Sequence, residues 1–227
     1  MCGRFTLTTP DVDALARVVS AEIDPRLLDL HQPRYNIAPT SVVPLLVPAA
    51  SRRVLEPGVW GLPSPFGDNK RPGGLINARA ETAAKLPTFR DAFARGRCGV
   101  MTDGFFEWTG PKPQRRPLWF RRHDGGPMVL AGLYRDTIDP ETGEVTRRFA
   151  ILTTRANATL APHHDRMPVI LPLPGLDRWL GATKPTDLAD LLEPAPDDLL
   201  STTPVSTRVN SVRFDDEGCI AGYQEVA

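Results

Sequence analysis

The chain has 227 residues, of which 41% are hydrophobic and 24% are charged, and this composition is typical of a globular protein rather than a disordered or fibrous one. Its 27 basic and 27 acidic residues give a formal net charge of zero, so an anionic partner such as nucleic acid or a membrane surface has to be met by a local basic patch. The length suffices for one substantial core, and we expect a single domain over residues 1–227.

The three cysteines, Cys2, Cys98 and Cys219, are odd in number and far apart in the sequence. They form no CxxC pair, which argues against a zinc site and against a disulfide framework. The first residues lack the basic and apolar regions of a secretory leader, and no segment approaches the roughly 20 apolar residues that span a membrane. We therefore expect a cytoplasmic protein with free thiols, without a metal or other cofactor and without a membrane partner.

The clearest predicted helix lies in the stretch TTPDVDALARVVSAE. Thr9 can cap this helix and Pro10 fits its first turn. Four apolar residues then share one face: Val12, Leu15, Ala16 and Val19. A second helix is predicted from Glu81 to Ala94. A third begins near Thr186, with three leucines facing inward: Leu188, Leu191 and Leu192.

Short β-branched or aromatic runs between these helices predict strands: SVVPLLV, MVLAGLY, RFAILTT and MPVILP. Two turn signals, HDGGP and DPETGE, are typical of hairpin tips. Several short strands with few helices favour an α+β fold, which we expect to be a bent, largely antiparallel β-sheet core with a few flanking helices.

The segment MCGRF places a cysteine directly after the first methionine. Removal of Met1 would leave an α-amine with a pKa of about 8 and a thiol with a pKa of about 8.5 on neighbouring carbons of Cys2. Such a pair condenses with an aldehyde, because the amine forms a Schiff base and the thiol then closes a five-membered thiazolidine. The alternative interpretation is a terminal residue without a chemical role.

Two further segments contain titratable side chains next to aromatic residues or proline. Glu107 in DGFFEW is either an exposed glutamate on an edge strand or a desolvated carboxyl with a raised pKa that transfers protons. Strand alternation would point Phe106 and Trp108 to the face opposite Glu107. In HHDRMP, His164 can titrate near neutral pH, or it is a loop histidine bonded to its neighbour, and His163 is a competing candidate.

Two asparagines invite similar pairs of interpretations. In LINARAET, Asn77 and Arg79 either orient a sugar and hold a phosphate, or form a strand-to-helix junction with polar caps. In YNIAPT, Asn36 either contacts a ligand or forms a turn, and the turn is favoured.

Together these segments resemble the SRAP family of abasic-site processing proteins. The resemblance covers most of the chain in the family's order, through MCGRF, YNIAP, WGL, NARAET, DGF-aromatic-EW, HDRMP and VSTRVN. The chain departs from the family after Trp60-Gly61-Leu62, where PSPFGDNK replaces an isoleucine, a proline and a second tryptophan. It also departs upstream of Asp103.

The resemblance implies a covalent reaction with abasic sites in single-stranded DNA, in which the crosslink shields the lesion. Carried onto matching positions, Cys2 is the nucleophile and Asn77 holds the opened sugar and the amine. Glu107 transfers protons, and His164 assists ring opening and the reverse step. The resemblance also implies lyase-like Schiff-base chemistry and a peptidase activity on the protein's own terminus or crosslinks.

The resemblance further implies contacts to single-stranded DNA from one set of residues: Arg4, Asn36, Pro39, Arg79, Arg90 and Trp108. Arginines beside the lesion would bind phosphates, and the tryptophan would support the pocket or stack on a base. We expect a monomer. Two other functions remain open at this point, a cysteine peptidase or N-terminal-nucleophile hydrolase, and a non-covalent binder of single-stranded DNA.

Overall fold

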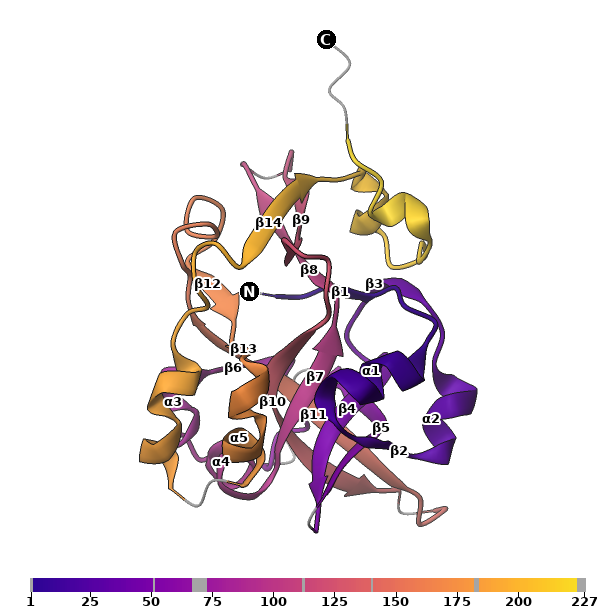
Figure 1. Cartoon of the computed structure of the whole chain (residues 1–227), viewed down its shortest axis with the longest axis vertical. Helices are drawn as coiled ribbons and strands as arrows, with labels where there is room; N and C mark the ends of the chain where they lie inside the picture. The colour runs from indigo at the N-terminus through magenta and orange to yellow at the C-terminus, as the bar shows by residue number, and fades with distance from the viewer. Residues whose placement is uncertain are drawn as a thin grey trace.

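The computed structural model describes residues 2–50, 52–66, 73–111, 113–139, 141–181 and 184–223 (Figure 1). Within them, five strands close into a ring. In the order of hydrogen bonding these are β11 (Val145–Arg155), β10 (Met128–Ile138), β7 (Arg97–Thr102), β4 (Val42–Ala49) and β5 (Arg52–Trp60). The ring closes where β5 pairs with β11 in parallel, whereas the other neighbours in the ring are antiparallel.

Four short strands extend this nine-stranded sheet: β2 (Glu22–Ile23), β6 (Asn77–Arg79), β12 (Arg166–Pro168) and β13 (Ile170–Leu171). A second, fully antiparallel sheet lies above the ring in Figure 1. Its order is β14 (Leu200–Pro204), β9 (Arg116–Arg122), β8 (Gly104–Thr109), β1 (Phe5–Leu7) and β3 (Arg34–Ile37). The predicted α+β class with a bent, largely antiparallel sheet is confirmed.

The helices are short and lie around the two sheets. The α-helices are α1 (Val12–Val19), α2 (Pro25–Leu30), α3 (Ala80–Ala83), α4 (Arg90–Arg95) and α5 (Leu176–Gly181). The 3₁₀ helices are η1 (Leu173–Gly175), η2 (Pro185–Leu192), η3 (Thr207–Asn210) and η4 (Glu217–Cys219). In the part of the chain that the structure describes, no helix is long and apolar enough to cross a membrane.

The predicted helices differ from the observed ones in their ends. Asp11, not Thr9, caps α1, since its carboxylate accepts a hydrogen bond from the Ala14 N–H at 2.8 Å. The continuous helix predicted over residues 81–94 is wrong, because Pro87 interrupts it and leaves α3 and α4 as separate pieces. The third helix is present as the 3₁₀ helix η2. Leu188 and Leu191 are buried and Leu192 is partly buried.

One of the two predicted hairpin tips is correct. DPETGE joins β10 to β11, which pair from Ile138 and Val145 onward. HDGGP is not a hairpin tip, because it connects β9 of the smaller sheet to β10 of the larger sheet. The residues of a turn specify a reversal of the chain, and they do not specify whether the flanking strands pair with each other.

The short strand β1 is held in the centre of the smaller sheet by both apolar and polar contacts. The Phe5 ring lies 5.0 Å from the buried Trp60 ring. Asp103, the single residue between β7 and β8, accepts hydrogen bonds from the Thr6 hydroxyl at 2.5 Å and from the N–H and hydroxyl of Thr8 at 2.6 Å each. The carboxylate of Asp103 therefore anchors the N-terminal strand to the crossing between the two sheets.

We expect Asp103→Ala to lower the free energy of unfolding by about 2 kcal/mol, because hydrogen bonds to a charged acceptor are lost at a half-buried site. Urea denaturation measures this change. The exposed Asp198→Ala serves as the matched control and should stay within about 0.5 kcal/mol of the unchanged protein. Equal stability of the two variants would contradict the anchoring role of Asp103.

Candidate active site around Cys2

Cys2 lies three residues before β1 and is fully buried. Its thiol donates a long hydrogen bond to the Arg4 carbonyl oxygen at 3.6 Å. Asn77, from β6, donates from Nδ2 to the Cys2 carbonyl oxygen at 2.9 Å. The Asn77 Oδ1 atom is buried and accepts no hydrogen bond from any residue that the structure describes. An unused acceptor is thus buried within one side chain's length of the Cys2 backbone.

Glu107 approaches Cys2 from the neighbouring strand β8. The antiparallel register sets Phe5 opposite Phe105, and the Phe106 N–H donates to the Arg4 carbonyl oxygen at 3.0 Å. Because the strands run in opposite directions, Glu107 lies beside the residues that precede Arg4.

The side chains of β8 alternate between two environments. Phe106 and Trp108 belong to a separate apolar cluster with Trp119, Val209 and Cys219. The Glu107 side chain points to the opposite face and is 3% exposed. The predicted alternation in DGFFEW agrees with this arrangement, and of the two interpretations of Glu107 the exposed edge glutamate is excluded.

Burial changes the protonation of both groups in the same direction. Desolvation raises the pKa of the Glu107 carboxyl, and the charge of His164 opposes this shift in part. Desolvation also raises the pKa of the Cys2 thiol, and the negative charge of Glu107 raises it further. The site therefore favours the neutral thiol, and the raised pKa of the Glu107 carboxyl makes it more readily protonated than an exposed glutamate.

The structure separates the two candidate histidines. His164 accepts a hydrogen bond at Nδ1 from the Arg166 N–H at 2.9 Å, and the same Nδ1 lies 3.0 Å from an Asp165 carboxylate oxygen. Its charge acts on Glu107. His163 instead contacts the Thr109 hydroxyl at 3.3 Å, and its ring lies 6.0 Å from the ring of Phe120. His164 is therefore the histidine that is electrostatically linked to Glu107.

Arg4 extends from the N-terminal segment toward residues near the C-terminus. Its Nη1 donates to Asn36 Oδ1 at 2.8 Å and to the Val209 carbonyl oxygen at 2.7 Å. Burial of the guanidinium lowers the pKa of Arg4. Asn36 is in strand β3 rather than in a turn and is 2% exposed, so its amide is positioned to hold the partly buried Arg4 side chain in place beside it.

An open groove of about 390 Å³ adjoins the N-terminal segment. It is lined by Gly3, Arg4, Trp108, Pro113, Arg115 and Asn210. Trp108 donates from Nε1 to Asn210 Oδ1 at 2.7 Å. Arg115 and Asn210 were not among the sequence-predicted site residues, although Arg115 belongs to the basic run QRRP and Asn210 ends the VSTRVN motif.

The remaining sequence-predicted residues lie on three different parts of the fold. Arg79 is exposed at the end of β6, two residues after Asn77. Pro39 is partly buried in the turn that follows β3. Arg90 begins α4, which Figure 1 places at the lower end of the molecule, away from the N-terminus. The structure thus brings together Cys2, Asn77, Glu107, His164, Arg4 and Trp108, and leaves Arg90 apart.

Arg166 is a further residue near the site that the sequence analysis did not assign. Its guanidinium donates to both carboxylate oxygens of Glu81, at 2.6 and 2.8 Å, and also to the carbonyl oxygen of Thr153. The HDRMP motif contains this arginine, so the motif itself was the signal that could have identified it.

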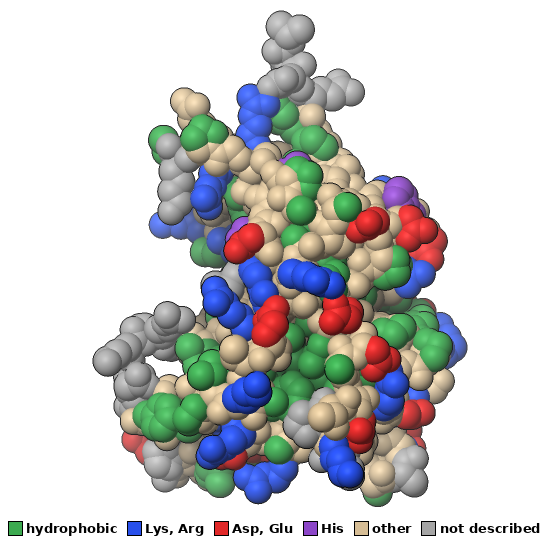
Figure 2. All heavy atoms as spheres, turned by 90° about the vertical axis from the view of Figure 1, so that its left-hand side faces the viewer, with side chains coloured by type: hydrophobic (Ala, Val, Ile, Leu, Met, Phe, Trp, Pro, Cys, Tyr) green, Lys and Arg blue, Asp and Glu red, His purple; other side chains and the backbone are tan. Residues whose placement is uncertain are grey.

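One face of the molecule has no single dominant charge. Figure 2 shows basic and acidic side chains interspersed, with apolar side chains among them, over the face that lies on the left in Figure 1. This mixture agrees with the formal net charge of zero. Attraction for an anion must therefore come from individual arginines beside the groove.

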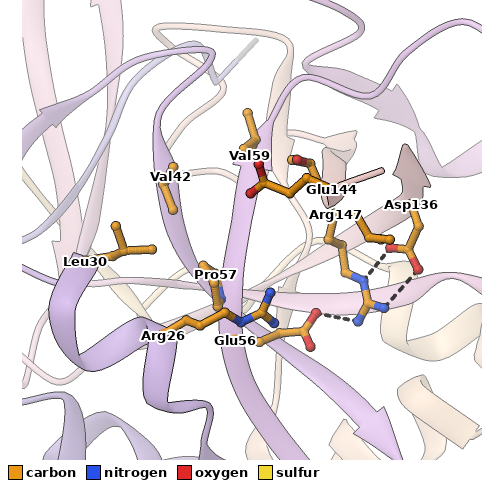
Figure 3. Close-up of a pocket in the computed structure, with 11 residues that line it drawn as sticks. Arg26, Leu30, Val42, Glu56, Pro57, Val59, Asp136, Glu144 and Arg147 are labelled. Carbon is orange, nitrogen blue, oxygen red and sulfur yellow. Dashed lines mark hydrogen bonds and ion pairs between the residues drawn. The ribbon is translucent and has the colours of Figure 1, made fainter. Parts of the chain in front are cut away.

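A second cleft, of about 430 Å³, lies between α2 and strands β4, β5, β10 and β11 (Figure 3). Arg147 extends into it between the carboxylates of Glu56 and Asp136, and its Nε donates to Asp136 at 2.8 Å. The residues that line this cleft include no cysteine and no histidine. This cleft therefore contains no group comparable to the Cys2 thiol. Among the described residues, no cluster of three or more His, Cys, Asp or Glu side chains could hold a metal ion.

Comparison of the sequence with known proteins matches this chain to a protein family. The sequence profile described as SOS response associated peptidase (SRAP) matches residues 1–212. The protein named Abasic site processing protein YoqW of Bacillus subtilis (strain 168) is 34% identical over 215 residues, which are 93% of this chain and 95% of that protein. Abasic site processing protein YedK of Escherichia coli (strain K12) is 34% identical over 182 residues, which are 79% of each chain.

A vertebrate protein and two solved structures extend the comparison. Abasic site processing protein HMCES of Xenopus tropicalis is 28% identical over 226 residues, covering 85% of this chain and 67% of that protein. A crystal structure of a Bacteroides thetaiotaomicron protein has a TM-score of 0.85 at 21% identity and covers 98% of this chain and 100% of its own, a likeness that shows the fold. A Bordetella bronchiseptica protein has a TM-score of 0.74 at 26% identity, with 90% and 100% coverage.

We expect Glu107→Gln to lower the pKa of the Cys2 thiol, because the substitution removes the negative charge that raises it. The profile of the Cys2 alkylation rate against pH, followed by peptide mass spectrometry from pH 6 to 11, should be displaced to lower pH in this variant. The rate at each pH below the raised pKa of the thiol should therefore be higher. Glu141→Gln, in the exposed turn between β10 and β11, is the matched control and should leave the profile unchanged. A profile in Glu107→Gln that stays in place or moves to higher pH would contradict the electrostatic link.

Proposed function

The chain belongs to the SOS response associated peptidase (SRAP) family, and from this membership we propose that it processes abasic sites in DNA by crosslinking itself to them through Cys2. Relatives at 34% identity are named abasic site processing proteins, which supports a DNA-processing role. The proposed substrate is an abasic site in single-stranded DNA, whose sugar is in equilibrium with an open-chain aldehyde. The proposed product is a thiazolidine that joins the protein to the strand.

The observation that carries this proposal is that Asn77 and Glu107 both act on Cys2 and that His164 acts on Glu107. Asn77 contacts the Cys2 backbone at 2.9 Å. Glu107 is buried and raises the pKa of the thiol by its charge. His164 acts electrostatically on Glu107 in turn. A nucleophile, a buried acid and a second titratable group are the parts that a condensation with an aldehyde requires.

The first proposed step is the attack of the Cys2 α-amine, freed by removal of Met1, on the aldehyde carbon. This attack forms a carbinolamine, which must lose its hydroxyl group as water. Glu107 is suited to donate the proton for this loss, because its raised pKa leaves more of the carboxyl protonated than in an exposed glutamate. The unused Asn77 Oδ1 is suited to accept an N–H of the amine and so to orient it. The products are a protonated imine, water and the Glu107 carboxylate.

The second proposed step is addition of the thiol to the imine carbon. The Glu107 carboxylate takes the thiol proton as the sulfur forms its bond to carbon, and the electron pair of the carbon–nitrogen double bond returns to nitrogen. This closes the five-membered ring and regenerates protonated Glu107. The sum of the two steps joins the aldehyde, the amine and the thiol with loss of one water. We assign to His164 the proton transfers that open the sugar ring and those that reverse the reaction.

DNA binding in this proposal relies on local contacts. Arg4 and Arg79 would face phosphates beside the lesion, and the Trp108 ring borders the groove next to Gly3. Holding the flanking strand raises the effective concentration of the aldehyde at Cys2. Because the charge contribution comes from a few arginines, affinity should fall with rising salt. Asn36 is buried, and it contributes to this interface by holding Arg4.

A cysteine-peptidase function is not favoured by the direction of the pKa shift of the Cys2 thiol. Cysteine peptidases use a thiolate, whose pKa is lowered by a neighbouring positive charge. In this chain burial and the charge of Glu107 raise the pKa of the Cys2 thiol. This direction suits a neutral thiol that gives up its proton only during addition to an imine, so we propose the crosslinking reaction as the main function.

We expect protein lacking Met1 to convert an abasic single-stranded oligonucleotide into a complex that survives heating and denaturing gel electrophoresis. Intact mass should equal protein plus oligonucleotide minus one water. Cys2→Ser keeps the amine and should form only an imine, which is lost on heating unless it is reduced with borohydride. Cys2→Ala should behave in the same way. An oligonucleotide without an abasic site is the control, and a heat-stable adduct with Cys2→Ala would refute the proposal.

The pH dependence of the crosslinking rate should depend on the protonation of the Glu107 carboxyl. The rate rises with pH as the α-amine loses its proton near pH 8. It falls as pH rises through the raised pKa of Glu107, because the protonated carboxyl is the active form. The product of the two is a bell-shaped profile. Glu107→Gln should react more slowly and lose the falling part of the profile, as measured by single-turnover gel assays from pH 5 to 9. A bell that persists in Glu107→Gln would exclude Glu107 as the acid.

A further inference from the structure

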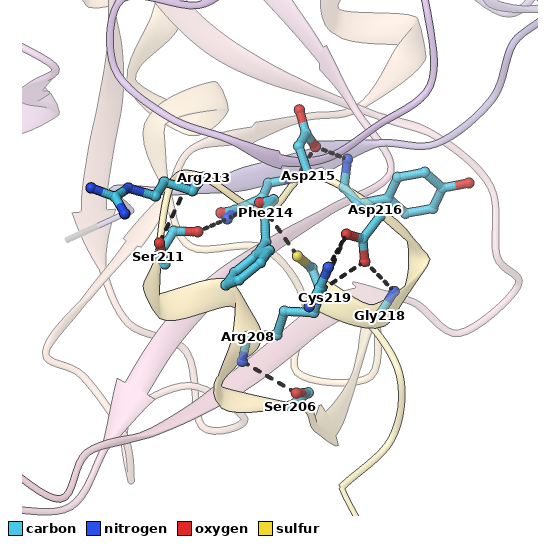
Figure 4. A network of polar contacts seen from close by, with 11 residues as sticks. Ser206, Arg208, Ser211, Arg213, Phe214, Asp215, Asp216, Gly218 and Cys219 are labelled. Carbon is cyan, nitrogen blue, oxygen red and sulfur yellow. Dashed lines mark hydrogen bonds and ion pairs between the residues drawn. The ribbon is translucent and has the colours of Figure 1, made fainter.

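The segment Ser206–Cys219, here called the C-terminal clasp, is bound to strand β3 by a network of polar contacts (Figure 4). The Asp215 carboxylate accepts hydrogen bonds from the Tyr35 N–H at 2.6 Å and the Asn36 N–H at 2.7 Å, and it also pairs with Arg34. In return, Asn36 Nδ2 donates to three carbonyl oxygens of the clasp, those of Val209, Ser211 and Phe214, at 3.2, 3.0 and 2.7 Å.

The clasp also has contacts of its own that fix its shape. Arg208 donates to both carboxylate oxygens of Asp216, and its guanidinium lies 3.8 Å from the centre of the Phe214 ring. The Gly218 N–H donates to Asp216 at 3.0 Å. Figure 4 shows these side chains gathered on one compact loop. The clasp is therefore a preformed unit that is attached to β3.

Two consecutive residues of the clasp reach the groove beside Cys2. The Val209 carbonyl oxygen accepts a hydrogen bond from Arg4 at 2.7 Å. Asn210 Oδ1 accepts one from Trp108 Nε1 at 2.7 Å. Arg4 and Trp108 both line the groove, and Asn210 lines it with them. The clasp thus holds two groove residues in place and contributes a third.

We propose that the clasp forms one wall of the nucleic-acid groove and that Asn210 is a contact residue of that wall, an inference that rests on the proposed function. Asn210 Oδ1 is occupied by Trp108, while its Nδ2 donates to no residue in the described part of the chain. The amide is exposed, so it presents two N–H donors to the groove.

The chemistry of the groove identifies the class of ligand. Its charged side chains are both arginines, Arg4 and Arg115, so it favours an anion. Trp108 adds an aromatic surface, on which a base can stack. An amide donor between arginines and an indole fits the phosphate and base of a nucleotide that adjoins the reacting sugar. Asn210 thereby acts on DNA directly and positions Trp108 through its oxygen.

The test compares Asn210→Ala and Asn210→Asp with the control Thr207→Ala, an exposed residue of the same 3₁₀ helix. Fluorescence anisotropy gives the apparent Kd for single-stranded DNA without a lesion. We expect Asn210→Ala to raise this Kd about five- to tenfold, because one or two hydrogen bonds to the strand are lost. Asn210→Asp should raise it further, most strongly at low salt, because a carboxylate faces the phosphates. Thr207→Ala should stay within twofold of the unchanged protein.

Tryptophan emission separates the positioning role from a loss of fold. Asn210→Ala removes the acceptor of the Trp108 N–H and should shift the emission, whereas Asn210→Asp retains an acceptor oxygen and should restore it. Thiazolidine formation at Cys2 with the small aldehyde glycolaldehyde should be equally fast in all variants, because it does not use the groove. Unchanged Kd values in both Asn210 variants would overturn the inference, and so would a Kd in Asn210→Asp equal to that of the unchanged protein.

The outcomes also separate this inference from the proposed function. If the unchanged protein forms no crosslink but the Asn210 variants still bind strands more weakly, the proposed function fails and the assignment of the groove holds. If crosslinking occurs but substitution of Asn210 does not change the Kd, the proposed function holds and the clasp has no part in DNA binding.

Discussion

The structure depends on the burial of the N-terminal strand in the middle of a sheet. Ends of chains usually fray unless they are tied down, and here β1 is hydrogen-bonded to β3 on one side and to β8 on the other. Phe5 packs on Trp60, and Asp103 binds Thr6 and Thr8. These contacts fix the path of the chain just before β1, so that Cys2 can be fully buried beside Glu107.

Burial of a thiol and a carboxyl together has an electrostatic consequence for the site. Burial leaves the ionised form of each group poorly solvated. The thiolate would also be repelled by the negative charge of the Glu107 carboxylate. Burial therefore shifts both groups toward their neutral forms, which avoid a buried uncompensated charge. Such a pair suits a condensation that moves protons between neighbouring groups but leaves the protein's charge unchanged at its end.

Sequence patterns predicted the features that depend on near neighbours. The alternation in DGFFEW placed Glu107 correctly opposite Phe106 and Trp108, and the four apolar runs became strands. Sequence patterns gave wrong predictions where the structure depends on more than the pattern of neighbouring residues. Pro87 breaks the helix predicted over residues 81–94, and the HDGGP turn joins strands of different sheets. The partner of Arg4 is 205 positions away, so the MCGRF motif alone could not show that Arg4 is held by a backbone carbonyl. The choice between His163 and His164 likewise required the fold.

The separation of Arg4 from Val209 has a consequence for biosynthesis. Translation at about 5–20 residues per second places roughly 10–40 s between the emergence of the first strand and that of the clasp. During that interval a nascent chain carries the thiol but not the loop that holds Arg4 and Trp108. The order of synthesis therefore delays assembly of the groove until the segment that contains Val209 and Asn210 has been made.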